Sequence, residues 1–240
     1  MAKIKKKRDW KRIVSILIFI SFIAPLGFII YKIFTAPTEA TADIEYARLR
    51  SDYIIMLLQC LLGVVCMFLP GWISKKWSIE IPSNMYFAFI VFLYGAIVLG
   101  EVRDFYNVIP AWDTILHVFS GGMLGALGFS IVHLLNREHV LEMHLSPFFI
   151  ALFAFTFAVT IGVFWEVYEF SADYFVGSNM QRHSHMDGTP KIGQEAVIDT
   201  MKDLIVDCAG AGAVSVAGYV SLKYKKGWLD RFLIKRGVKK

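Results

Sequence analysis

Charged residues are scarce in this 240-residue chain, and their scarcity argues against a soluble protein. They make up 19% of the sequence, whereas 56% is hydrophobic and the mean hydropathy is +0.54. Soluble domains average about 25% charged and about 45–50% apolar residues. The composition therefore predicts a membrane protein, and it excludes a disordered or fibrous chain.

Cysteine is also rare, and its placement excludes a disulfide framework. The three cysteines, Cys60, Cys66 and Cys208, lie in apolar segments, and no CxxC pair is present. The chain has no glycine-rich phosphate loop, nucleophile elbow or HExxH motif. Its net charge of +5 does not indicate nucleic-acid binding, because the basic residues concentrate at the two ends without interleaved aromatic residues that could stack on bases.

Six long apolar runs dominate what the sequence does contain. They cover residues 13–34, 53–69, 85–100, 114–135, 147–170 and 200–222. A helix needs about 20 apolar residues to cross a bilayer, and the short alternating segments of a β-barrel are not visible. We therefore predict an all-α fold, a polytopic membrane helix bundle of about six transmembrane helices over residues 13–222. We expect residues 1–240 to form a single integral membrane domain.

The distribution of Lys and Arg predicts how the bundle is oriented. With a cytoplasmic N-terminus, the cytoplasmic side holds 18 of the 25 Lys and Arg residues, in segments 1–12, 70–84, 136–146 and 223–240. This bias follows the positive-inside rule, so we expect both basic termini in the cytoplasm, next to anionic lipid heads. The first apolar run is about 22 residues long, whereas a secretory signal core has about 7–15, so we expect it to remain as an anchor.

Ionisable residues gather at one side of the predicted bundle. Even a lenient insertion scale assigns about 2.5–3.5 kcal/mol to a charge at the centre of a membrane helix, so such positions carry information. The outer ends of the third to sixth predicted helices carry Glu101, Asp104, Asp113, His117, Glu166, Glu169, Asp173, Asp199, Asp203 and Asp207. We therefore expect a polar pocket at the outer-leaflet ends of these four helices.

The spacing of these residues turns them toward the bundle interior. Asp113, His117 and Ser120 recur at i, i+4 and i+7 and share one helix face. Each polar stripe continues into small residues at four-residue spacing, such as Gly121 and Gly125 after His117. Small residues at this spacing mark close helix packing in membranes. The last three helices should therefore pack tightly and surround the polar pocket.

Several carboxylates at close range need compensation, either by shared protons or by bound cations. His117 and Lys202 are the positive groups expected nearby, and a mixed His and carboxylate set suits zinc, manganese or iron. We therefore expect a divalent metal whose identity stays unassigned. The expected roles are catalysis for Glu166 and Asp203, metal binding for His117, Glu169 and Asp207, and support from Asp113, Ser120, Asp173 and Asp199. Helix capping by Asp113 and Asp199, or structural hydrogen bonding by the buried acids, is the alternative.

Three ordered blocks resemble a known family. The segments WDTILHVFSGG (112–122), FWEVYEFSADYFVG (164–177) and VIDTMKDLIVDCAGA (197–211) are similar to blocks of the YjdF-like bacterial inner-membrane proteins and, more distantly, of VanZ-like proteins. The resemblance covers residues 85–222 and implies a multi-pass plasma-membrane protein without a settled reaction. Asp207 departs from the VanZ-like layout, in which an amide would be expected.

Three functions stay open on these grounds. The first is a metal- or ligand-binding site, with enzymatic use on a lipid-linked or cell-envelope molecule. The second is a proton- or cation-coupled transporter, and the third is an accessory subunit whose polar cluster only locks the bundle. Membrane lipids are expected partners, nucleic acids are not, and protein partners stay unassigned. The outer loop 174–198 adds His183, His185 and Asp187, an HxHxD run that could bind a metal or be a solvated loop.

Overall fold

The computed structural model describes residues 10–38, 48–136, 145–185 and 188–237, and most of them are helical. Six helices are long and apolar enough to cross a membrane: Trp10–Thr35, Arg50–Trp77, Ser83–Val102, Trp112–Leu135, Pro147–Val176 and Gly193–Lys223. The prediction of an all-α bundle with about six membrane helices is thus confirmed. The orientation of the termini stays a prediction.

The chain divides into two compact units, which are described separately. One comprises residues 1–72 and 86–104, and the other comprises residues 73–85 and 105–240. The sequence-based expectation of one membrane domain over the whole chain therefore stays a prediction.

The first unit contains α1 (Trp10–Ile23), α2 (Leu26–Thr35), most of α3 (Arg50–Trp77) and most of α4 (Ser83–Leu93), which continues as the π-helix η1 (Tyr94–Val102). The first membrane helix is interrupted at Pro25, because proline lacks a backbone N–H and restricts the residue before it. The buried side chains of Phe22, Met67 and Ile90 form the apolar core. Gly63 leaves room for the Phe22 ring, since a Cβ at this position would collide with it.

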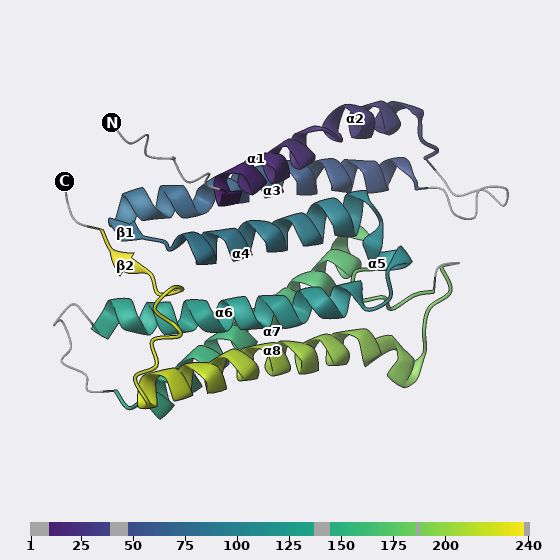
Figure 1. Ribbon diagram of the computed structural model, residues 1–240. Helices are drawn as coiled ribbons and strands as arrows, with labels where there is room; N and C mark the ends of the chain where they lie inside the picture. The colour runs from purple at the N-terminus through teal and green to yellow at the C-terminus, as the bar shows by residue number, and fades with distance from the viewer. Residues whose placement is uncertain (1–9, 39–47, 137–144, 186–187, 238–240) are drawn as a thin grey trace, which may run out of the picture. The chain divides into compact units, whose positions relative to one another are not determined.

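The second unit is built on three long helices, α6 (Trp112–Asn136), α7 (Pro147–Val176) and α8 (Ile198–Lys223), which pack together (Figure 1). Its shorter elements are β1 (Ile79–Glu80), α5 (Phe105–Val108), the 3-10 helix η2 (Gly193–Val197) and β2 (Lys235–Arg236). Local residue chemistry sets the ends of α7. The Phe149 N–H donates to Ser146 Oγ over 3.2 Å at its start, and Gly177, with φ 74°, ends it in the left-handed conformation.

Glycine allows the three helices to approach closely. A Cβ on Gly128 of α6 would lie 2.7 Å from the Cα of Ala154 in α7, and one on Gly121 would lie 2.6 Å from the backbone oxygen of Asp207 in α8. A Cβ on Gly218 of α8 would collide with the ring of Phe129 in α6. The close packing expected from the small-residue stripes is therefore present in the structure.

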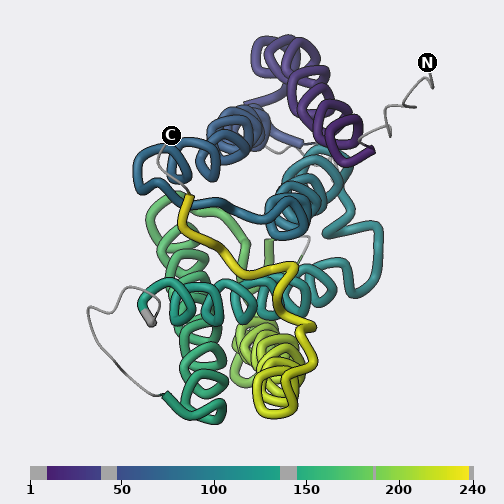
Figure 2. Tube along the Cα trace, turned by 60° about the vertical axis from the view of Figure 1, so that its left-hand side comes forward, coloured from purple at the N-terminus to yellow at the C-terminus, as the bar shows by residue number. Residues whose placement is uncertain are grey.

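The segment after α8 crosses α6 before it pairs with β1 (Figure 2). Ser130 Oγ of α6 donates to the Phe232 carbonyl over 3.0 Å and accepts from the Ile234 N–H over 3.3 Å. β2 then pairs with β1 in antiparallel register, Ile79 opposite Arg236 and Glu80 opposite Lys235. The C-terminal segment, which the sequence suggested as a topology signal next to anionic lipid heads, thus buries Leu229, Leu233 and Ile234, while its basic side chains from Lys225 to Arg236 are exposed.

Candidate functional site

Six carboxylates and one histidine meet at the end of the three-helix bundle where α6 begins, α7 ends and α8 begins. This carboxylate cluster consists of Asp113, His117, Glu166, Glu169, Asp199, Asp203 and Asp207. All except Asp113 are buried, and Asp203 is only 1% exposed. The cluster forms because the three acids of α8 recur every four residues on one buried face, opposite the polar ends of α6 and α7.

The two ring nitrogens of His117 face different carboxylates. Nε2 lies 3.7 Å from Asp113 Oδ1 and 4.0 Å from Asp203 Oδ2, and Nδ1 lies 3.4 Å from Asp207 Oδ2. Within the described part of the chain, one group of three His, Cys, Asp or Glu side chains has ligand atoms close enough together to hold a metal ion. It consists of Asp113, His117 and Asp203, whose ligand atoms lie within 4.8 Å of one another. Helices α6 and α8 thus bring these three side chains to one point.

Several buried polar atoms of the cluster make no hydrogen bond with any residue that the structure describes. Both carboxylate oxygens of Glu166 belong to this set, together with Asp199 Oδ2, Asp203 Oδ1 and His117 Nδ1. Glu166 nevertheless has the Thr200 hydroxyl close by and interacts electrostatically with His117, Asp199 and Asp207. An unpartnered buried carboxylate costs free energy, so these atoms indicate a place for a ligand, an ion or water.

Arg182 is a cation of the site that the sequence did not assign to the cluster. Its guanidinium lies 3.5 Å from Asp113 Oδ2 and 3.9 Å from Asp199 Oδ1, and it donates to the Tyr106 carbonyl over 3.2 Å. Lys202, the cation that the sequence suggested, is exposed but interacts electrostatically with Asp199. Arg182 is 69 residues from Asp113 in the chain, so no local pattern placed the two side by side.

The charges of the cluster do not balance. His117 and Arg182 pair with carboxylates of the cluster, and Lys191 and Lys202 interact electrostatically with Asp199, so the six carboxylates outnumber these four cations by two even when His117 is charged. Close carboxylates in a water-poor site repel one another strongly. Bound cations, protons or both therefore have to supply the missing positive charge.

The remaining predicted site residues have identifiable contacts. Ser120 Oγ donates to the His117 carbonyl over 2.9 Å and lies 3.4 Å from Asp207 Oδ1. Glu169 accepts a hydrogen bond from Trp165 Nε1 over 2.9 Å and interacts electrostatically with Asp113 and His117. The structure therefore groups both residues with the cluster.

Asp173 does not join the cluster but organises the loop that follows α7. Its Oδ1 accepts from Ser178 Oγ over 2.6 Å and from the Met180 N–H over 2.7 Å, and its Oδ2 accepts from the Gln181 N–H over 2.9 Å. Oδ2 also lies 3.2 Å from His183 Nδ1. These contacts hold the loop on either side of Arg182, so Asp173 supports the site indirectly.

Replacing Asp173 with alanine should loosen this loop. Hydrogen bonds to a charged acceptor contribute about 1.5–3 kcal/mol each, so the Met180 and Gln181 amides should exchange about 10–100-fold faster. Hydrogen–deuterium exchange by mass spectrometry would measure this rate. Asp230→Ala is the control, because Asp230 is exposed and lies after α8. Unchanged exchange in Asp173→Ala would contradict the assigned role.

The other acids and histidines that the sequence singled out have contacts of their own. Asp104 forms an ion pair of 2.8 Å with Arg48, which also donates to the Glu101 carbonyl, and all three belong to the first unit. In the HxHxD run, His183 pairs with Asp173, and His185 lies 3.8 Å from Glu195. Asp187 lies outside the described residues. A contribution of the third predicted helix to the pocket stays a prediction.

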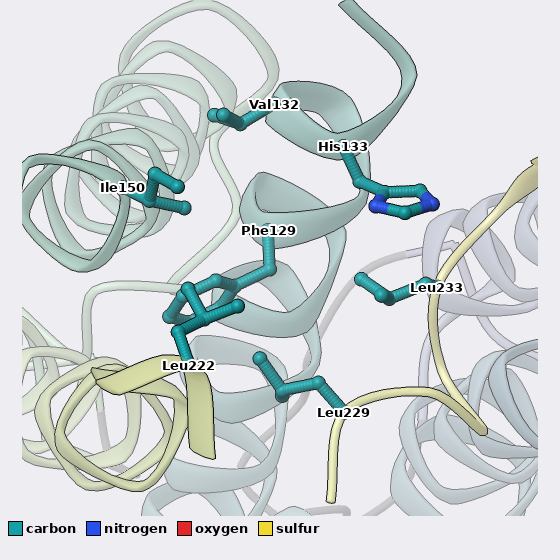
Figure 3. Close-up of a pocket in the computed structure, with 7 residues that line it drawn as sticks. All are labelled: Phe129, Val132, His133, Ile150, Leu222, Leu229 and Leu233. Carbon is teal, nitrogen blue, oxygen red and sulfur yellow. The ribbon is translucent and has the colours of Figure 1, made fainter. Parts of the chain in front are cut away.

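A separate cavity of about 210 Å³ lies at the opposite end of the three-helix bundle. Figure 3 shows its lining, which consists of Phe129, Val132, His133, Ile150, Leu222, Leu229 and Leu233. Six of these side chains are apolar, and Leu229 and Leu233 come from the segment that follows α8. The cavity therefore differs in chemistry from the carboxylate cluster.

Comparison with known proteins places the chain in a family. An uncharacterised protein of Thermotoga maritima is 28% identical over 168 residues, which cover 68% of this chain and 77% of the relative. No solved structure matches. The family model described as predicted membrane protein (DUF2238) matches residues 13–224. This agrees with the YjdF-like resemblance, whereas the VanZ-like resemblance stays a prediction. The chain is thus a multi-pass membrane protein that belongs to the DUF2238 family.

Proposed function

We propose that this membrane protein binds a divalent cation at Asp113, His117 and Asp203. We further propose that the site serves a metal-dependent reaction on a lipid-linked or cell-envelope molecule. The observation that carries the proposal is the position of His117 Nε2, which faces carboxylate oxygens from α6 and α8 in a buried place. The surplus of negative charge around this point favours a cation.

The distances suit a metal ion. Ligand atoms around a tetrahedral ion with bonds of about 2.1 Å are about 3.4 Å apart. The separations of Nε2 from its two carboxylate partners, 3.7 and 4.0 Å, exceed this value by only a few tenths of an ångström. Three protein ligands also leave a position open, as in catalytic rather than structural metal sites. One nitrogen and two oxygens suit zinc, manganese or iron.

Glu166 supports a reactive role for the site. Both of its oxygens are buried and make no hydrogen bond of ordinary geometry with the described residues, and the Thr200 hydroxyl and His117 are its neighbours. When bound, a divalent ion would activate water or polarise a substrate group. A free carboxylate next to it can accept and return a proton, which is the role of a general base.

The position of the cluster bears on the substrate. The acids lie at the ends of α6, α7 and α8, so a molecule would reach them from one membrane face. With the N-terminus in the cytoplasm, this face is the outer one. A lipid-linked or envelope molecule is therefore the substrate class that we propose.

A proton- or cation-coupled transporter has less support. Coupled transport needs a path of polar groups through the membrane. Among the described residues beyond Asp207, the buried polar side chains of α6, α7 and α8 are Ser130, Ser215 and Ser221. Serine does not carry charge, so the ionisable groups of the cluster do not continue as a buried relay.

Metal content tests the proposal directly. The full chain, purified in detergent without chelators and incubated with Mn²⁺ or Zn²⁺, should retain about one equivalent by inductively coupled plasma mass spectrometry. Asp203→Asn should lose it, because a ligand is removed. Glu166→Gln should retain it, because Glu166 does not belong to the ligand group.

Asp230→Asn is the matched control for the Asp203 substitution, since it makes the same chemical change at an exposed site. Absence of metal from the parent protein, or equal metal in Asp203→Asn, would refute the proposed site. Proton or cation flux in proteoliposomes would then test the transporter alternative.

A further inference from the structure

We propose that Asp207 and Gly162 are positioning residues, which orient His117 so that its Nε2 atom faces the cation site. This inference rests on the proposed function and deepens it. It assigns Asp207 a different role from the metal ligand that the sequence suggested. It also gives a specific role to Gly162, which belongs to the stripe of small residues that precedes Glu166 at four-residue spacing.

The first step of the argument concerns the histidine ring. A neutral imidazole carries one proton, and the nitrogen without the proton is the metal ligand. Nδ1 lies 3.4 Å from Asp207 Oδ2, whereas Nε2 faces Asp113 and Asp203. A proton on Nδ1 would lie on the same side of the ring as the Asp207 carboxylate, although the present geometry is not that of a hydrogen bond, and it would leave the Nε2 lone pair for the ion. In metal sites, the second ring nitrogen of a ligand histidine usually donates to a carboxylate or a carbonyl, and this contact fixes the tautomer.

The second step concerns the place of Asp207 relative to the ion. Its nearer oxygen lies on the Nδ1 side of the ring, whereas the converging ligand atoms come from Asp113, His117 and Asp203. A single ion bound to Nε2 therefore has the imidazole ring between itself and Asp207. This arrangement makes Asp207 a partner of the histidine instead of a ligand.

The third step explains why Asp207 stays there. A Cβ on Gly162 of α7 would collide with Asp207 Oδ2 and lie 3.2 Å from its Cγ, so only glycine leaves the carboxylate its space. On the α6 side, Gly121 lies against the backbone oxygen of Asp207, and Ser120 Oγ is 3.4 Å from Oδ1. Three helices thus confine one buried carboxylate, which is 3% exposed.

The binding test uses Co²⁺ as the probe, because its visible absorption reports both affinity and coordination geometry. The detergent-purified full chain is titrated with Co²⁺ alone, beside Asp207→Asn, Gly162→Ala and Gly212→Ala. The first two variants should bind Co²⁺ about 10–100-fold more weakly, which is the usual effect of losing a residue that orients a metal ligand. Gly212→Ala is the control, because its Cβ would lie 3.8 Å from the Phe155 ring, an ordinary contact.

A second readout separates positioning from a general structural role. Nitrogen-15 spectra of labelled histidine, with the His117 signal identified by its loss in His117→Gln, report which ring nitrogen carries the proton. At a pH high enough to leave the imidazole neutral, the metal-free parent should show the proton on Nδ1. Asp207→Asn and Gly162→Ala should shift His117 toward a mixture of the two tautomers, and Gly212→Ala should not.

The outcomes distinguish this inference from the proposed function. If the parent binds Co²⁺ and both variants bind it equally with an unchanged tautomer, the positioning role is overturned and the metal site stands. If the parent binds no Co²⁺, the proposed function fails. If the nitrogen-15 spectrum of the metal-free parent shows the His117 proton on Nε2, the positioning role is overturned as well. If Gly162→Ala fails to fold, Asp207→Asn decides alone.

Discussion

Replacing His117 with alanine is expected to abolish the stabilisation of this protein by divalent cations. His117 Nε2 is the one nitrogen in the proposed ligand group. Its loss should weaken cation binding by more than about 100-fold, because losing a ligand costs more than losing a residue that only orients one. A cation at 100 times its dissociation constant stabilises the folded protein by about 2.7 kcal/mol. At the same concentration, a variant that binds 100-fold more weakly gains only about 0.4 kcal/mol.

Thermal unfolding of the detergent-purified protein, with and without Mn²⁺, would measure this effect as a shift in Tm. His133→Ala is the matched control, because His133 lies on the same helix but lines the apolar cavity at the opposite end. The parent and His133→Ala should show the same Mn²⁺-dependent shift. An equal shift in His117→Ala would show that the cation binds elsewhere.

The largest effect on stability is expected for Gly210→Ala. A Cβ on Gly210 of α8 would collide with the backbone oxygen of Val118 in α6, and a backbone atom cannot rotate away as a side chain can. The two helices must therefore move apart. Overpacking of this kind costs about 1–3 kcal/mol, and the higher helix propensity of alanine, about 1 kcal/mol, offsets only part of it.

Gly212→Ala makes the same change two residues further along α8, where the new methyl group meets only ordinary contacts. It should be neutral or slightly stabilising. Unfolding by increasing SDS in mixed micelles would give the free energies of both variants. Equal stability of Gly210→Ala and Gly212→Ala would contradict the close approach of α6 and α8.

The sequence alone predicted the six membrane helices and the burial of the acids. Hydrophobic runs as long as a bilayer is thick leave few alternatives to a spanning helix. The spacing of Asp199, Asp203 and Asp207 predicted a single face, because helix geometry repeats every 3.6 residues. These features are local, so they can be deduced from a short segment of the chain.

The tertiary structure decided which groups meet. Arg182 reaches Asp113 from a loop about 70 residues away, Asp173 turns to that loop, and Lys202 faces outward. Periodicity along one helix could not predict these contacts, because they depend on how separate segments pack.

Packing also decided which nitrogen of the His117 ring faces which carboxylate. The sequence suggested Asp207 as one more acid of the pocket, whereas the structure places it at Nδ1, opposite the side that faces Asp113 and Asp203. That position depends on the space that Gly162 leaves on a different helix. The sequence by itself thus determined the membrane helices and the chemistry available at their ends. Only the packing of α6, α7 and α8 determined which atoms face one another, because the fit between helices depends on side chains far apart in the chain.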